Sequence, residues 1–177
     1  MLQRKQSLFL LLAAVALALC FSFPIATYHA TTAWGTQAEG VLNLVAKANP
    51  AMMDQVAAGE EVMMSQKEYF NTWPLLVLTL LVQAIAVVSI FLFKNRVRQM
   101  KVVAVAFLLC VVEIFLTFIW AVDAYGNVMT EVLKCGEMTV SYGVGTWCPI
   151  AAAVLLFLAQ RGIKKDEEKV RAADRLR

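Results

Sequence analysis

The sequence predicts an all-α integral membrane protein. Its four transmembrane helices are expected to form a bundle with a small extracytoplasmic cap and a cytoplasmic C-terminal helical tail, in one domain over residues 1–177. Hydrophobic residues make up 60% of the chain and charged residues 16%, whereas soluble domains have about 45–50% and about 25%. Four apolar runs are close to the length that a bilayer requires, and basic residues collect at one side of them. This composition excludes a disordered chain and most soluble globular domains.

Four segments approach the roughly 20 apolar residues that a spanning helix needs. We place the expected spans at residues 8–26, 73–93, 102–122 and 141–159. The fourth is the least regular, because glycines, a cysteine and Pro149 occupy its first half. We expect Pro149 in the first helical turn, where its missing N–H costs little, and a helix that continues past Ala159 into the charged tail 160–177.

The first segment also has a feature of a cleaved signal peptide, since Arg4 and Lys5 precede it. Its apolar stretch is 19 residues long, however, whereas the core of a signal peptide has about 7–15. No A-x-A cleavage pattern follows, and Leu19 is too large for the position before a lipoprotein cysteine at Cys20. These features favour an uncleaved transmembrane helix.

The basic residues orient the chain, because Lys and Arg collect on the cytoplasmic side of membrane proteins. Thirteen of the 16 basic residues lie in the N-terminus, in the link between the second and third spans, and in the tail. The outer loops 29–72 and 123–140 carry three basic and eight acidic residues. All four Trp and all four Tyr lie on the outer side or at its interface. Both termini are therefore expected in the cytoplasm.

Several segments resemble a known family. They are MLQRKQSLFLLLAA at the start, WPLLVLTLL at the opening of the second span, FKNRVRQMK between spans and IKKDEEKVRAADRLR at the end. Together they resemble an uncharacterised domain-of-unknown-function family of small bacterial four-span membrane proteins, and KDEEKVRAADRLR is the most specific part. The resemblance implies a multi-pass protein of the bacterial inner (cytoplasmic) membrane. It implies no activity and carries over no catalytic residue.

The outer loop 29–72 has two interpretations. Within it, five apolar residues follow helical spacing, namely Val41, Leu42, Leu44, Val45 and Ala48. This segment is either a small cap over the bundle or an amphipathic helix at the lipid interface, and the second is the simpler interpretation. Four methionines of the loop are better explained by packing than by soft-metal binding: Met52, Met53, Met63 and Met64.

Two cysteines are expected on the outer side. Cys135 and Cys148 are 13 residues apart, and a disulfide that closes such a loop stabilises by about 3 kcal/mol. Two buried thiols are the alternative, and a thiol-disulfide exchange role is a weaker third hypothesis, because that chemistry usually employs a CxxC pair. Cys20 and Cys110 lie within spans and are expected to pack as apolar residues.

Glu113 is the residue of the sequence that most strongly indicates a functional site. An acidic residue near the centre of a span has a high free-energy cost of insertion and is often functional. Gln83 is the centre of the second span, so the two residues are expected at nearly equal depth in antiparallel neighbouring helices. If the faces match, Gln83 could hydrogen-bond a protonated Glu113, with Thr79 and Thr117 each one turn away. The pair either holds the two helices together, forms part of a pathway for protons or cations, or contacts another subunit.

The leading hypothesis for function is a non-enzymatic accessory or assembly subunit without a cofactor or metal. The alternatives are a small ion, proton or lipid transporter that uses Glu113, and a membrane thiol-disulfide protein that uses Cys135 and Cys148. Expected partners are the lipid bilayer and either another membrane protein or a second copy, but not nucleic acid. The tail has helical i,i+4 charge pairs, and its basic residues suit anionic headgroups better than a cytoplasmic partner.

Overall fold

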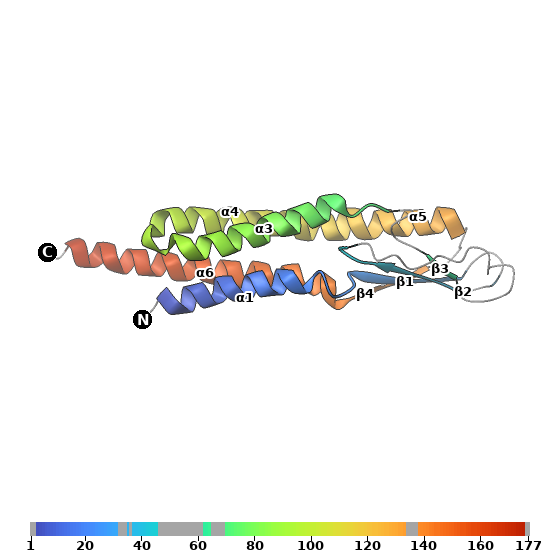
Figure 1. Ribbon diagram of the computed structural model, residues 1–177, viewed down its shortest axis with the longest axis horizontal. Coiled ribbons are helices and arrows are strands. Elements are labelled where there is room, and N and C mark those ends of the chain that lie inside the picture. Colours follow the sequence, from blue (N-terminus) through green and yellow to red (C-terminus); the bar gives the residue numbers. More distant parts are fainter. Residues whose placement is uncertain are drawn as a thin grey trace. The chain divides into compact units, whose positions relative to one another are not determined.

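The computed structural model describes residues 3–31, 35, 37–45, 62–64, 70–133 and 138–175. The chain forms two compact units, which we describe separately. The helical unit comprises Met1–Ala18, Leu78–Glu113 and Cys148–Arg177, and the sheet unit comprises Leu19–Val77 and Ile114–Trp147. Figure 1 shows the helices and strands along the chain.

Helices account for most of the described residues. They are α1 (Gln3–Leu19), α3 (Trp73–Phe91), the 3-10 turn η2 (Leu92–Lys94), α4 (Arg96–Phe115), the π-helix η3 (Leu116–Val122), α5 (Asp123–Leu133) and α6 (Val144–Arg175). Among the residues that the structure describes, three helical stretches are long and apolar enough to cross a membrane, namely Trp73–Phe91, Arg96–Val132 and Val144–Val170. The first apolar helix, α1, is shorter, with 17 residues.

The bounds of three expected spans need correction. The first helix ends at Leu19 rather than residue 26, because Pro24 lacks an N–H and disfavours helical geometry at the residue before it. The third continues without a break into α5, so residues 123–133 are helix rather than loop. The fourth begins at Val144 rather than residue 141, and its predicted continuation past Ala159 is confirmed, since α6 ends at Arg175.

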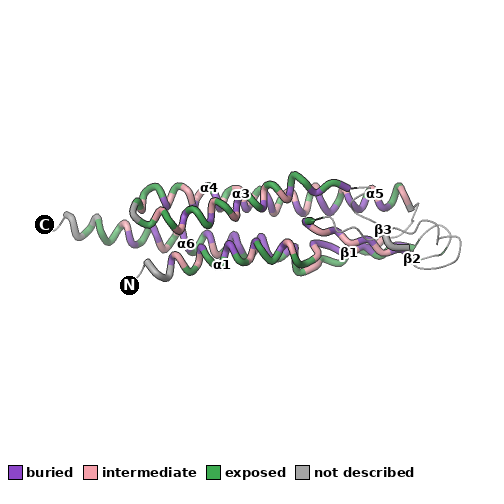
Figure 2. Tube along the Cα trace, viewed as in Figure 1, coloured by how far each residue is buried: buried purple, intermediate pink, exposed green. Residues whose placement is uncertain are grey.

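Each helix of the helical unit buries one narrow stripe of residues. The buried positions recur every three or four residues, and Figure 2 shows them alternating with exposed turns. This spacing is that of helices packed side by side along a seam. The buried residues are Gln6, Leu10, Ala13, Ala14 and Leu17 of α1; Thr79, Val82, Ala86 and Ser89 of α3; Gln99, Val103, Ala106, Cys110 and Glu113 of α4; and Cys148, Pro149, Ala152, Ala153, Leu156, Ala159, Ile163 and Asp166 of α6.

The described part of the sheet unit contains four strands, so the expectation of an all-α fold is wrong. The strands are β1 (Ala26–Thr31), β2 (Gln37–Leu42), β3 (Val62–Met64) and β4 (Met138–Tyr142), in the spatial order β3-β2-β1-β4. β1 pairs antiparallel with β2 and with β4, whereas β2 and β3 are parallel. The helix expected from Val41 to Ala48 is also corrected, because Val41 and Leu42 end strand β2.

One face of this sheet packs against helix. Tyr28 of β1 is fully buried, and the centroid of its ring lies 5.0 Å from the ring centroid of Tyr125 of α5. The Tyr28 hydroxyl donates to Val122 O at 2.8 Å. Gly40 of β2 lies so close to α5 that a Cβ there would be 2.3 Å from Met129 Sδ. The side chains of β1 and β2 alternate between this packed face and the opposite, polar face.

The start of α6 is fixed by glycines. Gly143 N donates to Ile25 O and Gly145 N to Pro24 O, at 2.8 and 2.9 Å. Helix α6 begins at Val144, so Pro149 lies in the second turn. The expectation that it lies in the first turn is therefore wrong. A proline there leaves the carbonyl four residues earlier without its helical partner. That carbonyl belongs to Gly145, and it accepts a hydrogen bond from Cys20 Sγ at 3.8 Å.

Candidate functional site

The first candidate site is the buried carboxyl group of Glu113 in the helical unit. Glu113 is 1% exposed and Thr79 is fully buried. Thr79 Oγ1 donates to Glu113 Oε1 at 2.5 Å, which links α3 to α4. The antiparallel hairpin that η2 closes brings these two residues, 34 positions apart, to the same level. Thr79 is one of the two threonines expected one turn from the level of Glu113.

Gln83, one turn from Thr79 on α3, contacts a different helix. Its Nε2 donates to Ala14 O of α1 at 3.5 Å, and the side chain is half-buried. The structure therefore gives the two predicted intramembrane polar residues separate roles. Glu113 joins α3 to α4, and Gln83 joins α3 to α1.

Two further hydrogen bonds complete a ring of polar contacts between helices. Cys110 Sγ donates to Pro149 O at 3.3 Å, which joins α4 to α6. Gln6 Nε2 donates to the buried carboxylate of Asp166, which joins α6 to α1. Each helix of the helical unit is thus connected to two neighbours, in the order α1, α3, α4, α6 and back to α1. Hydrogen bonds of this kind hold helices together where the hydrophobic effect between them is weak.

The chemistry available to Glu113 follows from its surroundings. An ionised carboxylate is costly in an apolar environment unless it is paired or hydrogen-bonded. A carboxyl group held by a threonine hydroxyl can accept and release a proton, or it can act only as a contact between helices. Both interpretations start from the same hydrogen bond.

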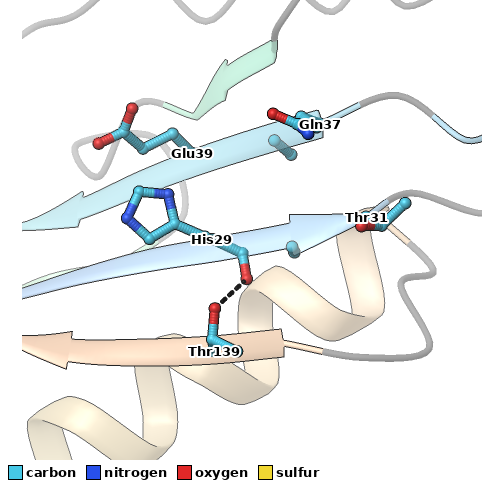
Figure 3. Close-up of a pocket in the computed structure, with 7 residues that line it drawn as sticks. His29, Thr31, Gln37, Glu39 and Thr139 are labelled. Carbon is cyan, nitrogen blue, oxygen red and sulfur yellow. Dashed lines mark hydrogen bonds between the residues drawn. The ribbon is translucent and has the colours of Figure 1, made fainter.

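A second candidate site lies on the polar face of the sheet unit. His29 of β1 stands opposite Glu39 of β2 and opposite Thr139 of β4 in the strand register, so the three residues form a row across the sheet. Figure 3 shows the side chains of His29 and Glu39 on the same face. They border a pocket of about 530 Å³ whose other lining residues are Ala30, Thr31, Gln37, Ala38 and Thr139.

The polar side chains of this face are accessible. His29, Thr31, Gln37 and Thr139 are exposed, and Glu39 is half-buried. Thr139 Oγ1 donates to His29 O at 3.3 Å, the contact drawn in Figure 3, so this hydroxyl ties β4 to β1. The pocket therefore offers an imidazole, a carboxylate, an amide and a hydroxyl from Thr31 for hydrogen bonding.

Sequence reasoning missed this second site. The signal that could have found it is the alternation of polar and small or apolar residues in ATYHAT (26–31) and QAEGVL (37–42), because this period is that of a strand with one buried face. Within the described part of the chain, no group of three or more His, Cys, Asp or Glu is arranged to hold a metal ion.

The cysteine hypothesis is only partly covered by the structure. Cys148 is buried near the beginning of α6. Cys135 lies outside the described residues. The predicted pairing of Cys135 with Cys148 therefore stays a prediction. Cys20 and Cys110 are buried, and each contacts a backbone carbonyl as described above.

The fold defines a mostly helical protein with a small sheet, whose long apolar helices are compatible with a membrane location. The chain belongs to the family DUF4293, described as a domain of unknown function, whose model matches residues 2–176. The predicted resemblance to an uncharacterised family is thereby confirmed. No curated protein matches the chain.

Proposed function

We propose that this chain is a four-pass protein of the bacterial inner membrane with both termini in the cytoplasm. The distribution of basic residues supports this orientation. Within the helical unit, the start of α1, the turn between α3 and α4, and the C-terminal part of α6 lie at the same end (Figure 1). These are the segments that carry most of the Lys and Arg. At 1.5 Å per residue, the 17 residues of α1 extend about 26 Å, close to the thickness of the hydrocarbon core.

In this topology the sheet unit is the extracytoplasmic cap. Its strands β1, β2 and β3 come from the segment between α1 and α3, and β4 comes from the segment between α5 and α6. With both termini in the cytoplasm, these connections lie on the opposite side of the membrane. The polar row of His29, Glu39 and Thr139 then faces the extracytoplasmic space.

The orientation can be tested with single cysteines in a variant without the native cysteines. Thr31→Cys lies on the exposed polar face and Lys165→Cys on the exposed surface of the tail helix. A membrane-impermeant maleimide should label the cysteine at position 31 in intact spheroplasts, and the one at position 165 only after lysis. The reverse pattern, or equal labelling before lysis, contradicts the proposed topology.

Within that topology, the chain acts as a non-enzymatic accessory or assembly subunit whose cap binds a membrane protein partner. One observation carries this proposal. The sheet packs one face on α5 and presents on the other a pocket bordered by polar side chains from three strands. Neutral and charged hydrogen-bonding groups of this kind are typical of the polar part of protein interfaces.

Site-specific photocrosslinking tests the docking role. A benzophenone amino acid at Gln37, on the polar face, should yield a discrete adduct with one other protein in native membranes. The same amino acid at Val112, which is exposed on α4, should give lipid adducts only. Copurification of the captured protein in stoichiometric amounts supports an accessory subunit. Adducts between two copies of this chain, or no protein adduct at all, overturn it.

Proton or cation transport is the second candidate, and the buried contact between Glu113 and Thr79 favours it. Proteoliposomes loaded in separate preparations with a dye sensitive to pH, to Na⁺ or to K⁺ measure each flux directly. Transport by the wild type that is lost in Glu113→Gln supports this function. A wild type that carries no proton, Na⁺ or K⁺ under an imposed gradient excludes it for these ions and leaves Glu113 as a contact between helices.

A further inference from the structure

A small apolar groove lies in the helical unit between α3 and α4. Its volume is about 290 Å³, and it is lined by Ile85 of α3 and by Lys101, Val102 and Val105 of α4. The lining is entirely apolar, so Lys101 contributes carbon atoms of its stem. The charged end of this exposed lysine therefore extends beyond the groove, as lysine side chains do at the edge of an apolar surface.

The groove continues a stripe along α4 that changes from cationic to apolar. Arg98, Lys101, Val102 and Val105 are spaced i, i+3, i+4 and i+7 and therefore share one face of the helix. Arg98 and Lys101 are exposed. The segment from 92 to 112 contains no acidic residue that could neutralise them. One face of α4 thus presents two positive charges and, one turn further along, an apolar groove.

The depth of this stripe matches one leaflet of a bilayer. Lys101 is five residues from the start of α4, which corresponds to about 7.5 Å along the helix axis, and Val105 is at about 13.5 Å. Ile85 lies six residues before the end of α3, at about 9 Å. Half of the hydrocarbon core is about 15 Å thick. The apolar groove therefore lies at the level of acyl chains, and the cationic groups lie on the side nearer the headgroups.

We propose that this groove binds one anionic phospholipid. An acyl chain lies against Ile85, Val102 and Val105, and the phosphate of the headgroup contacts Lys101 and Arg98. The occupant follows from the two halves of the site, because only a molecule with an anionic head and an apolar chain satisfies both. This inference rests on the membrane location proposed above, but not on a docking partner or on transport.

Native mass spectrometry of the full-length protein in mild detergent tests the site. The probes are phosphatidylglycerol and phosphatidylcholine with identical acyl chains, so that only the headgroup charge differs. The wild type should retain one phosphatidylglycerol in preference to phosphatidylcholine. Lys101→Gln should weaken this retention about fivefold, the effect of one well-placed basic residue. Lys101→Arg should preserve it.

Two variants separate a defined site from general attraction between charges. Lys165→Gln removes an equal charge from the exposed surface of α6 and should leave retention unchanged. Val105→Phe fills the groove without a change of charge and should reduce retention as strongly as Lys101→Gln. Equal binding of the two lipids, an equal loss in Lys165→Gln, or full retention in Val105→Phe would each overturn the proposal. Membrane extraction of the same variants reports separately on the membrane location.

Discussion

Thr79 and Glu113 form a direct hydrogen bond of 2.5 Å between α3 and α4, and both side chains belong to the buried stripes of their helices. A hydroxyl and a carboxyl at these positions give two apolar helices a defined axial and rotational match. Interhelical hydrogen bonds in membrane proteins contribute about 0.6 kcal/mol on average and at most about 1.7 kcal/mol. The contact is therefore a means of specifying the packing more than a main source of stability.

Thr79→Val should lower the free energy of unfolding by about 0.6–1.7 kcal/mol, because valine has nearly the same shape but no hydroxyl. Glu113→Gln should have a smaller effect, since an amide oxygen still accepts the bond from Thr79. Reversible unfolding in mixed micelles of mild detergent and dodecyl sulfate measures both. In a Glu113→Leu background the cost of Thr79→Val should largely disappear. An unchanged cost there would show that Thr79 acts independently of Glu113.

The long apolar helices could be read from the sequence because their signal is local. Nineteen residues from Trp73 to Phe91 form α3, and the predicted span began at the same residue. The charge pairs of the tail likewise predicted the continuation of α6. The depth of Glu113 followed from counting along two joined helices. Its contact with Thr79 depends on how far each helix is rotated about its axis, which residue counting does not determine.

The sheet could not be read in the same way, because its pairing is long-range. Ala26 of β1 pairs with Tyr142 of β4, more than a hundred residues later in the chain. Residues 20–26 are also apolar enough to extend the preceding helical pattern, which hid the turn at Pro24 and the start of β1. The row of His29, Glu39 and Thr139 exists only once these three strands are in register.

Gly143 and Gly145 should tolerate no side chain. A Cβ at Gly143 would lie 2.3 Å from Pro24 O, and one at Gly145 would lie 2.7 Å from Pro24 O. Both contacts are with backbone, which cannot move aside as a flexible side chain can. Gly143→Ala and Gly145→Ala should each destabilise the protein by about 1–3 kcal/mol, measured as a lower thermal unfolding midpoint in detergent.

Gly162→Ala is the matched control for these two variants. A Cβ at Gly162 would lie 3.2 Å from Cγ of the flexible Gln6 side chain. Alanine also favours a helix interior over glycine by up to about 1 kcal/mol. The control should therefore unfold at the same temperature as the wild type or slightly above it. Equal losses at all three glycines would contradict the role of backbone contact at the start of α6.

Tyr28 and Tyr125 make a matched pair for testing buried hydroxyl groups. Both residues are fully buried and their rings are in contact, but only Tyr28 has a described acceptor, Val122 O. Among the described residues, the hydroxyl of Tyr125 has no hydrogen-bond partner. Tyr28→Phe should cost about 0.5–1.5 kcal/mol, because it removes the hydrogen bond that the Tyr28 hydroxyl donates to Val122 O.

Tyr125→Phe should be neutral or stabilising, since it removes a buried polar atom that has no described partner. Thermal unfolding of the two variants, followed by circular dichroism, compares them directly. A larger loss for Tyr125→Phe than for Tyr28→Phe would indicate that the Tyr125 hydroxyl has an acceptor beyond the described residues, and it would reverse the ranking expected here.

Tyr28 makes the stability of the folded protein depend on pH in the alkaline range. Burial, with a smaller contribution from the neighbouring Tyr125, raises the pKa of Tyr28 well above its ordinary value of about 10. The unfolded chain therefore loses the phenolic proton at a lower pH than the folded chain does. Between the two values the unfolded state binds fewer protons, so the free energy of unfolding falls as pH rises. Below the unfolded pKa of about 10 the contribution of Tyr28 is fully present.

Unfolding midpoints measured from pH 8 to pH 12 test this sign. The midpoint of the wild type should fall above about pH 10, and the decline should be shallower in Tyr28→Phe, because phenylalanine has no proton to lose. Tyr142→Phe is the control, since Tyr142 is half exposed, at 51%. It should leave most of the decline in place. A decline of equal steepness in the wild type and Tyr28→Phe would assign the alkaline sensitivity to other groups, and it would contradict a buried neutral phenol as its source.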